Sequence, residues 1–125
     1  MNQAIIEAKK ALLDKQIPVG AIIVQNNKII ARAHNNNFID NDPTSHAEIN
    51  VIRSACKLLG RPRLDGCHLY VTIEPCIMCA AVISKSRISR VYYGAIQEKY
   101  GAYESSNFYL NNAKNYHIPE IYGLI

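Results

Sequence analysis

The segment at residues 72–79, Thr-Ile-Glu-Pro-Cys-Ile-Met-Cys, constrains this chain more than any other part of its sequence. It is typical of a strand end followed at once by a helix that opens with Pro75, because proline is tolerated at the first helical position. Cys76 and Cys79 are three residues apart, so they share one helical face and can bind one metal ion. Two thiolates make half of a tetrahedral site, and the rest of the chain must supply the other half.

A second pattern, His46-Ala47-Glu48, lies at the start of another predicted helix. Two helix N-termini that follow a strand or loop can meet over one edge of a sheet, which would bring His46 to Cys76 and Cys79. Three protein ligands with an open fourth position are the pattern of a catalytic zinc site, where the ion lowers the pKa of a bound water. Glu48 follows His46 too closely to be the fourth ligand, and we expect it to carry protons between water and substrate.

Each of these residues also has an ordinary structural interpretation. Ser45-x-x-Glu48 matches a helix capping box, and an isolated Cys-x-x-Cys is often a structural zinc half-site or a redox pair. A single histidine is more often a core or surface residue than a ligand. The coincidence of His-x-Glu with Pro-Cys-x-x-Cys decides between these interpretations, because together they are the known signature of zinc nucleobase deaminases.

The remaining pattern predicts an α/β fold in which a mixed five-stranded sheet carries helices on both faces. Asn26-Asn27 suits a two-residue hairpin turn between the first two strands, since asparagine tolerates positive φ. The polar segment at 34–44 is expected to be a functional loop. We expect helices over residues 2–15, 45–59 and 75–84, a weak helix over 105–114, and strands over 21–24, 29–31, 69–72, 91–94 and 118–124.

Length and composition limit which kinds of protein this chain can be. The 125 residues, about half of them apolar, predict a single domain over residues 1–125. No secretory signal or membrane-spanning run is present, which favours the cytoplasm and no membrane association. The net charge of +4 is compatible with an anionic partner such as RNA but does not require one. Cys56 and Cys67 lack partners at ligand spacing, so we expect them to be buried thiols.

The chain resembles the bacterial tRNA-specific adenosine deaminases, within the cytidine deaminase superfamily. The His-x-Glu and Pro-Cys-x-x-Cys motifs mark the superfamily. The Asp-Pro-Thr before the histidine and the Ser-Arg-Ile and Tyr-Gly-Ala after the second cysteine indicate the adenosine deaminase branch and its guanine- and cytosine-specific relatives. The matching segments span nearly the whole chain and lie at residues 17–21, 42–48, 74–80, 86–88 and 91–95.

The resemblance implies a three-layer α/β/α sandwich, a homodimer, and hydrolytic deamination of the wobble adenosine to inosine in a tRNA anticodon stem-loop. It also implies one zinc ion per chain, held by His46, Cys76 and Cys79, with Glu48 moving protons. By the same resemblance, Asn35 binds the flipped base. The other residues that it assigns to the substrate are Val19 and Ile23 as pocket walls, together with Asp42 and Lys99.

Two departures from the family bear on substrate choice. The family usually has an Asp-x-Lys-x-Gly segment after Gly-Ala, and here Gln97 replaces the aspartate while Lys99 and Gly101 match. The family also continues with a helix where this sequence ends at Ile125, so we expect the fold to lack that helix. Two alternatives therefore stay open: a free-base or nucleoside deaminase acting on cytosine or guanine, and a catalytically silent zinc-containing RNA-binding subunit.

Overall fold

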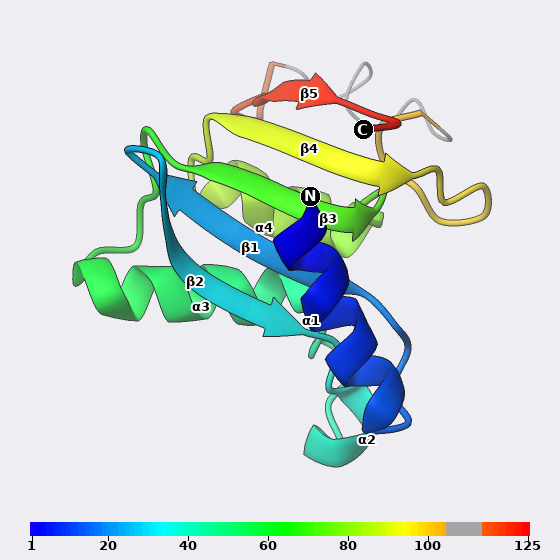
Figure 1. Ribbon diagram of the computed structural model, residues 1–125. Helices are drawn as coiled ribbons and strands as arrows, with labels where there is room; N and C mark the ends of the chain where they lie inside the picture. The colour runs from blue at the N-terminus through cyan, green and yellow to red at the C-terminus, as the bar shows by residue number, and fades with distance from the viewer. Residues whose placement is uncertain (105–113) are drawn as a thin grey trace.

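The computed structural model describes residues 1–104 and 114–125, and a five-stranded mixed sheet forms the middle layer of this part (Figure 1). The strand order is β2-β1-β3-β4-β5. β1 is antiparallel to both β2 and β3, whereas β3, β4 and β5 are parallel. The strands are β1 (Gly20–Gln25), β2 (Lys28–His34), β3 (His68–Ile73), β4 (Arg90–Ala95) and β5 (Glu120–Tyr122).

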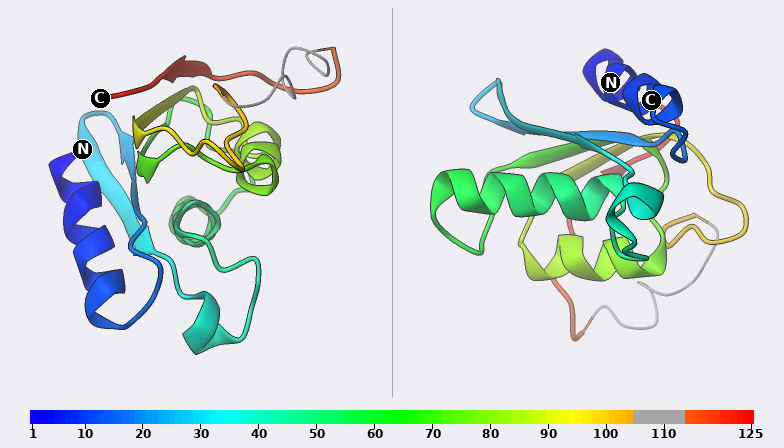
Figure 2. Two further views of the ribbon diagram at one scale, coloured as in Figure 1. Left: turned by 90° about the vertical axis from the view of Figure 1, so that its right-hand side faces the viewer. Right: turned by 90° about the horizontal axis from the view of Figure 1, so that it is seen from below.

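Helices cover both faces of this sheet, so the predicted three-layer sandwich is confirmed (Figure 2). α1 (Asn2–Leu13) lies on one face, and α3 (Ala47–Leu59) and α4 (Ile77–Lys85) lie on the other. The core fills the space between the sheet and α3 and α4, where the alternate residues Leu69 and Val71 of β3 are fully buried. In the described part of the chain, no helix is both long and apolar enough to cross a membrane.

The hairpin between β1 and β2 forms as predicted. Asn26 and Asn27 have φ angles of 50° and 61°, the positive values that a two-residue hairpin turn requires. At the far end of β1, Gly20 is required by space, because a Cβ there would overlap the carbonyl oxygen of Ala4. α1 therefore packs closely on the start of β1, next to the edge that holds the candidate site.

Helix boundaries differ from the prediction at both motif-bearing helices. α4 begins at Ile77 with Cys76 as its N-cap, so Pro75 lies before the helix rather than in its first turn. Cys76 has an extended backbone (φ −75°, ψ 171°), and the carbonyl of Pro75 accepts a hydrogen bond from the Ala102 N–H instead of starting the helix. A long-range contact that local spacing does not reveal thus sets this boundary.

The capping box that Ser45-x-x-Glu48 would allow as an ordinary structural interpretation does not form at the start of α3. His46 is the N-cap of this helix, in an extended conformation. Ser45 instead donates its hydroxyl proton to Asp40, at 2.6 Å. Asp40 belongs to α2 (Asn37–Asp40), one helical turn inside the segment that was predicted to be a loop.

The C-terminal part agrees with the prediction only in part. β5 is an edge strand as expected but comprises only residues 120–122 of the predicted 118–124. The weak helix predicted over 105–114 lies outside the described residues except for Lys114, which is in a turn.

The topology brings one end of four strands to the same edge of the sheet. The start of β1 pairs with the end of β2 through Gly20 and His34, and the ends of β3 and β4 pair through Ile73 and Ala95. α3 follows β2 and α4 follows β3, so the N-termini of both helices lie over this edge (Figure 1). The fold thereby places the His46 and Cys76 motifs beside each other.

Candidate active site

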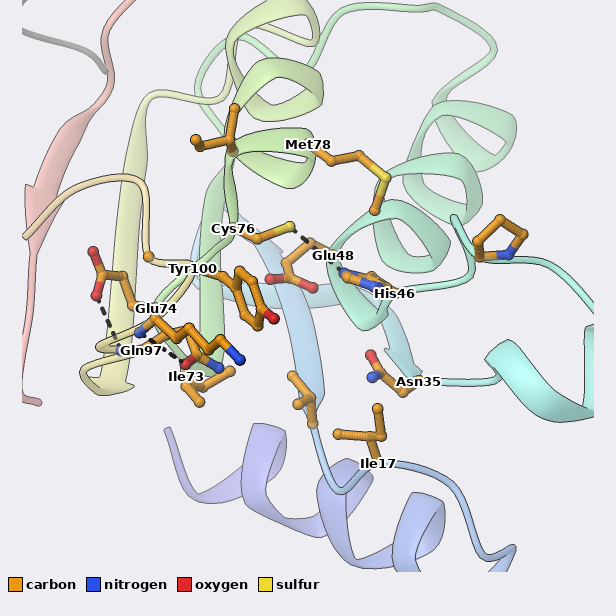
Figure 3. A pocket seen from close by; sticks show the side chains of 15 residues that line it. Ile17, Asn35, His46, Glu48, Ile73, Glu74, Cys76, Met78, Gln97 and Tyr100 are labelled. Atoms are coloured by element: carbon orange, nitrogen blue, oxygen red, sulfur yellow. Dashed lines mark hydrogen bonds between the residues drawn. The ribbon is translucent and has the colours of Figure 1, made fainter. Parts of the chain in front are cut away.

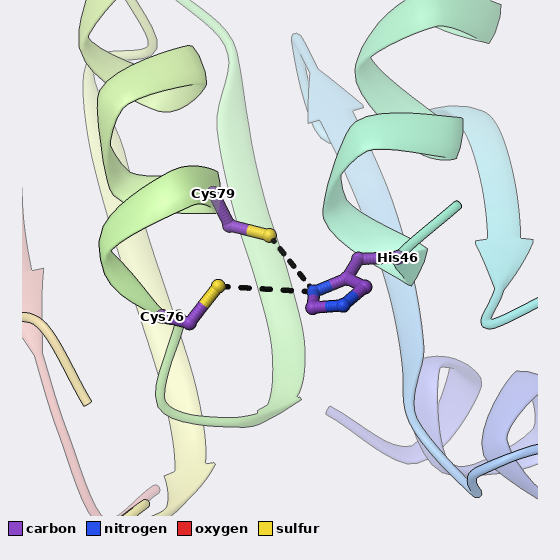
Figure 4. Close-up of side chains that lie close together, drawn as sticks. All are labelled: His46, Cys76 and Cys79. Carbon is purple, nitrogen blue, oxygen red and sulfur yellow. Dashed lines mark hydrogen bonds between the residues drawn. The ribbon is translucent and has the colours of Figure 1, made fainter. Parts of the chain in front are cut away.

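Three donor atoms converge where the two helix N-termini meet (Figure 4). Nδ1 of His46 lies 3.4 Å from Sγ of Cys79 and 3.8 Å from Sγ of Cys76. In the part of the chain that the structure describes, these residues form a group of His, Cys, Asp or Glu whose donors all lie within 4.8 Å of one another. His46 and Cys76 are thirty positions apart in the sequence, and the fold brings them together as the sequence predicted.

The geometry of these donors suits a zinc ion. A tetrahedral zinc with Zn–S near 2.3 Å and Zn–N near 2.0 Å holds sulfur and nitrogen donors about 3.6 Å apart. The two sulfur–nitrogen distances of 3.4 and 3.8 Å bracket that value. Two thiols and an imidazole, without an oxygen donor, favour zinc over magnesium or calcium. Three protein donors leave a fourth position for a water or a substrate atom.

Glu48 lies beside this donor set, in the first turn of α3. Its side chain is almost entirely buried (3% exposed) and reaches the Cys79 thiol. Burial raises the pKa of the Glu48 carboxyl to about 7, although the nearby His46 charge acts in the opposite direction. The site thus contains a buried carboxyl group next to the expected metal position and outside the donor set.

The two cysteines share a proton unequally. A hydrogen bond from Cys79, together with a smaller contribution from His46, lowers the pKa of Cys76 to about 4. The same bond and burial raise the pKa of Cys79. The hydrogen bond to Cys76 also raises the pKa of His46. These shifts favour the thiolate at Cys76 over Cys79, and a cation that binds all three residues displaces the remaining protons.

A pocket of about 690 Å³ opens directly onto the donor set (Figure 3). His46, Glu48 and Cys76 line its inner end. Its volume suits a nucleobase with part of its sugar, since pockets for small molecules measure roughly 300–1,000 Å³. The other lining residues come from the loop before β1, the end of β2, the end of β3, α4 and the segment after β4: Ile17, Val19, Asn35, Pro43, Ile73, Glu74, Ile77, Met78, Gln97, Lys99, Tyr100 and Gly101.

Three residues that the sequence assigned to the substrate line this pocket: Val19, Asn35 and Lys99. The Asn35 Oδ1 atom accepts a hydrogen bond from the Ala47 N–H at 2.7 Å, which ties the end of β2 to the start of α3. Because the oxygen is used in this way, Asn35 presents its amide NH₂ group to the pocket. An NH₂ group offers donors to a ring nitrogen or carbonyl of a base.

Two other assigned residues lie elsewhere. Ile23 does not line the pocket; it is fully buried in the core, because its side chain points between the sheet and α3. Asp42 is also absent from the pocket lining, since its carboxylate accepts hydrogen bonds from the backbone and hydroxyl of Thr44. The same two bonds lower the pKa of Asp42. The structure therefore contradicts Ile23 as a pocket wall, whereas Asp42 lies outside this pocket and shapes the turn that leads into His46.

Sequence reasoning gave no role to several residues that line the pocket. Glu74, Met78 and Tyr100 are among them. Glu74 lies within the motif that indicated the family, but its hydrogen bonds reach residues more than twenty positions away. No local spacing encodes such contacts, so only the general rule that buried carboxylates are hydrogen-bonded could have drawn attention to it.

The fold and this donor set match what is expected of a zinc-binding deaminase domain, and comparison with known proteins shows the family. Residues 1–95 match the family model of the cytidine and deoxycytidylate deaminase zinc-binding region. The chain belongs to this family. It is 48% identical over 123 residues to a tRNA-specific adenosine deaminase of Agrobacterium fabrum, an alignment that covers 98% of this chain and 81% of that protein. It is also 50% identical over 101 residues to the enzyme of the same description from Bacillus subtilis, covering 81% of this chain and 63% of the relative.

Two solved structures extend the comparison. One comes from biochemical and structural studies of A-to-I editing by tRNA:A34 deaminases at the wobble position of transfer RNA. It superposes with a TM-score of 0.94 at 47% identity and covers 98% of this chain and 89% of that chain. The other is guanine deaminase from Bacillus subtilis, with a TM-score of 0.74 at 43% identity, covering 76% of this chain and 61% of that chain.

Proposed function

We propose that this chain is a zinc-dependent hydrolytic deaminase that converts the wobble adenosine of tRNA to inosine. The observation that carries this proposal is the placement of a buried glutamate beside a three-donor set at the inner end of a base-sized pocket. Similarity at 48% identity over nearly the whole chain to a tRNA-specific adenosine deaminase supports the choice of substrate.

His46, Cys76 and Cys79 hold one zinc ion per chain in this proposal, and the ion supplies a Lewis acid that lowers the pKa of the attacking water. Glu48 accepts the proton of that water and delivers it to N1 of the adenine ring as oxygen adds to C6. Glu48 then assists proton transfer to the amino group, the C6–N bond breaks, and ammonia leaves. Water and adenosine are consumed, and inosine and ammonia are formed.

Asn35 orients the base in this reaction. Its amide NH₂ group faces the pocket while its oxygen is fixed on the Ala47 N–H. This bond links base recognition to the first turn of α3, which also carries Glu48. The hydrogen bond between Asn35 and the Ala47 N–H therefore fixes the position of a base bound by Asn35 relative to Glu48. Val19 contributes an apolar wall.

The proposal includes an RNA partner, a second copy of the chain and a cytoplasmic site of action. Lys99 lines the pocket and supplies a cation for the phosphates of an anticodon stem-loop. The homodimer rests on the family resemblance, and light scattering at micromolar concentration would test it. A tRNA substrate, together with cysteines that form no disulfide among themselves, supports the cytoplasm.

Guanine deamination is the second candidate, because the chain is 43% identical to a guanine deaminase of solved structure. That similarity covers less of this chain, 76% against 98%, and has the lower TM-score, 0.74 against 0.94. The tRNA substrate is therefore preferred. A silent RNA-binding subunit is disfavoured because Glu48, the proton carrier that such a subunit would not need, is present and buried beside the donor set.

The deciding experiment presents purified protein with an anticodon stem-loop that contains a wobble adenosine and, separately, with free guanine, cytosine and adenosine. We expect inosine in the stem-loop and ammonia in equal amount. A stem-loop with guanosine at the wobble position is the matched control and should stay unchanged. Turnover of the free bases alone would contradict the proposal.

A further inference from the structure

One buried carboxylate at the pocket has no part in the proposed chemistry. Glu74 follows β3 directly and is only 1% exposed. Its Oε2 atom accepts the N–H of Gln97 at 3.0 Å, and its Oε1 atom accepts the N–H groups of Tyr103 and Glu104 at 2.9 and 2.6 Å. Figure 3 shows Glu74 turned away from His46 and toward the loop that carries Gln97. The carboxylate is thus aimed at a chain segment and not at the donor set.

All three bonds hold the same stretch, residues 96–104, which we call the rim segment. It leaves the end of β4 and returns across the start of α4, where Gly101 bridges to Cys76 and the Ala102 N–H donates to the Pro75 carbonyl at 2.9 Å. No helix or strand forms between residues 96 and 100. The N–H groups of Gln97, Tyr103 and Glu104, toward the two ends of the segment, have the Glu74 carboxylate as their acceptor.

Gly101 shows how closely the segment approaches that side chain. A Cβ added at Gly101 would overlap the Glu74 carboxylate and would lie 2.6 Å from the carbonyl oxygen of Gln97. Glycine is needed here because of space, since the backbone packs directly on the carboxyl group. This close packing is independent of the hydrogen bonds and indicates the same contact.

The rim segment presents binding groups to the pocket. Lys99, Tyr100, Gln97 and Gly101 all line it. The Lys99 ammonium lies over the Tyr100 ring at 5.2 Å from its centroid, and Tyr100 is 59% exposed. A cation for phosphate and an exposed aromatic face for a base are what single-stranded nucleic acid requires of its binding surface.

We propose that Glu74 is a positioning residue for substrate recognition: its carboxylate fixes the rim segment so that Lys99 and Tyr100 contact the nucleotides that flank the reacting base. The inference rests on the proposed function for the identity of those nucleotides. It assigns to the glutamate of the Glu-Pro-Cys motif a task that is separate from the metal. Loosening the segment then weakens the binding of RNA and leaves the chemistry intact.

Glu74→Gln tests this directly. The amide oxygen still accepts two N–H groups, but the amide NH₂ faces the third, so one charge-assisted bond is lost. We expect KM for the stem-loop to rise about tenfold, while kcat changes less than about twofold and zinc content stays unchanged. Glu7→Gln is the matched control, because Glu7 is a buried carboxylate (3% exposed) on α1 that does not line the pocket. It should leave KM unchanged.

Gly101→Ala perturbs the same contact while leaving the carboxylate in place. It should raise KM similarly, and the two substitutions together should cost less than the product of their separate effects, since both loosen one contact. A fall in kcat at constant KM, loss of zinc in Glu74→Gln, or fully multiplicative effects would overturn the proposal.

Hydrogen exchange separates this inference from the proposed function, because it needs no turnover. In Glu74→Gln we expect faster exchange at the amides of Gln97, Tyr103 and Glu104, with no change at Leu69 and Val71 in the core. Unchanged exchange at the three amides would refute the positioning role even if the wild type forms inosine. If exchange is faster in Glu74→Gln but the wild type forms no inosine, Glu74 still positions the rim segment and the tRNA substrate is rejected.

Discussion

The metal centre and the rim segment form two sides of one pocket but are held in place by different means. His46, Glu48, Cys76 and Cys79 are the N-caps or first-turn residues of α3 and α4, whose helices pack on the sheet. The rim segment is held instead by the Glu74 carboxylate, which lies 23 to 30 residues away in the chain, and by backbone contacts of Gly101 and Ala102 with the start of α4. The proposed reacting groups are thus placed by the packing of two helices, whereas the proposed recognition groups depend on a few long-range bonds, and Glu74 accepts three of these.

This division predicts different kinetic consequences on the two sides. Substitutions in the metal centre should lower kcat, because they remove interactions that form only in the transition state. Substitutions in the rim segment should raise KM. A metal-centre variant that changes only KM, or a rim-segment variant that changes only kcat, would contradict this division of roles.

The largest effect is expected at Glu48. Glu48→Gln keeps the size of the side chain but cannot accept a proton, so inosine formation should fall about 1,000-fold. Zinc content, measured by elemental analysis, should stay at the wild-type level because Glu48 is not among the donors. Loss of zinc together with activity would mean that this residue supports the donor set instead.

A smaller loss, about 100-fold in kcat/KM, is expected for Asn35→Ala, since the base loses a hydrogen-bond donor in a site built to supply it. Asn35→Asp is the informative partner. It keeps an oxygen for the Ala47 N–H and removes the NH₂ donors, so its activity should fall as far. Wild-type activity in Asn35→Asp would mean that Asn35 does not bind the base through its NH₂ group and only holds the start of α3 in place.

Lys99→Ala should raise KM for the stem-loop only a few-fold and leave kcat unchanged, because one phosphate contact is removed. Its KM should also depend less steeply on salt than that of the wild type, by about one unit in the logarithmic slope. Lys28→Ala, at the start of β2 and outside the pocket, is the control for a simple change in net charge. Equal slopes in all three proteins would remove Lys99 from the RNA contact.

The smallest kinetic effect belongs to Ile23, which the sequence placed in the pocket and the structure places in the core. Ile23→Val should lower the free energy of unfolding by about 1 kcal/mol, through the lost methylene and the space left behind. KM and kcat should not change. A raised KM with unchanged stability would restore Ile23 to the pocket wall.

The donor set of the site was predictable because short spacings encode it. His46-x-Glu48 and Cys76-x-x-Cys79 each place two side chains within one helical turn, and an alternating strand–helix order brings helix starts to one sheet edge. The same logic predicted the sandwich and the Asn26-Asn27 turn, because propensity and periodicity are local properties.

Features set by long-range contacts were not predictable in this way. The start of α4 depends on the hydrogen bond from the Ala102 N–H to the Pro75 carbonyl. The role of Asp42 depends on the two hydrogen bonds that its carboxylate accepts from the backbone N–H and the hydroxyl of Thr44. Alternation within β1 does not tell which of its apolar residues reach a pocket at the sheet edge, so Ile23 was misplaced. The contacts of Glu74 join the end of one strand to a loop after the next, and the sequence contains no spacing for them.

The most direct test of the metal centre measures inosine formation against bound zinc. Wild-type protein is stripped with a chelator, reloaded with graded amounts of zinc and assayed on the wobble-adenosine stem-loop. We predict no inosine without zinc and a rate that rises in proportion to bound metal until about one ion per chain is reached. Inosine formed at the full rate by protein that contains no zinc would contradict the account.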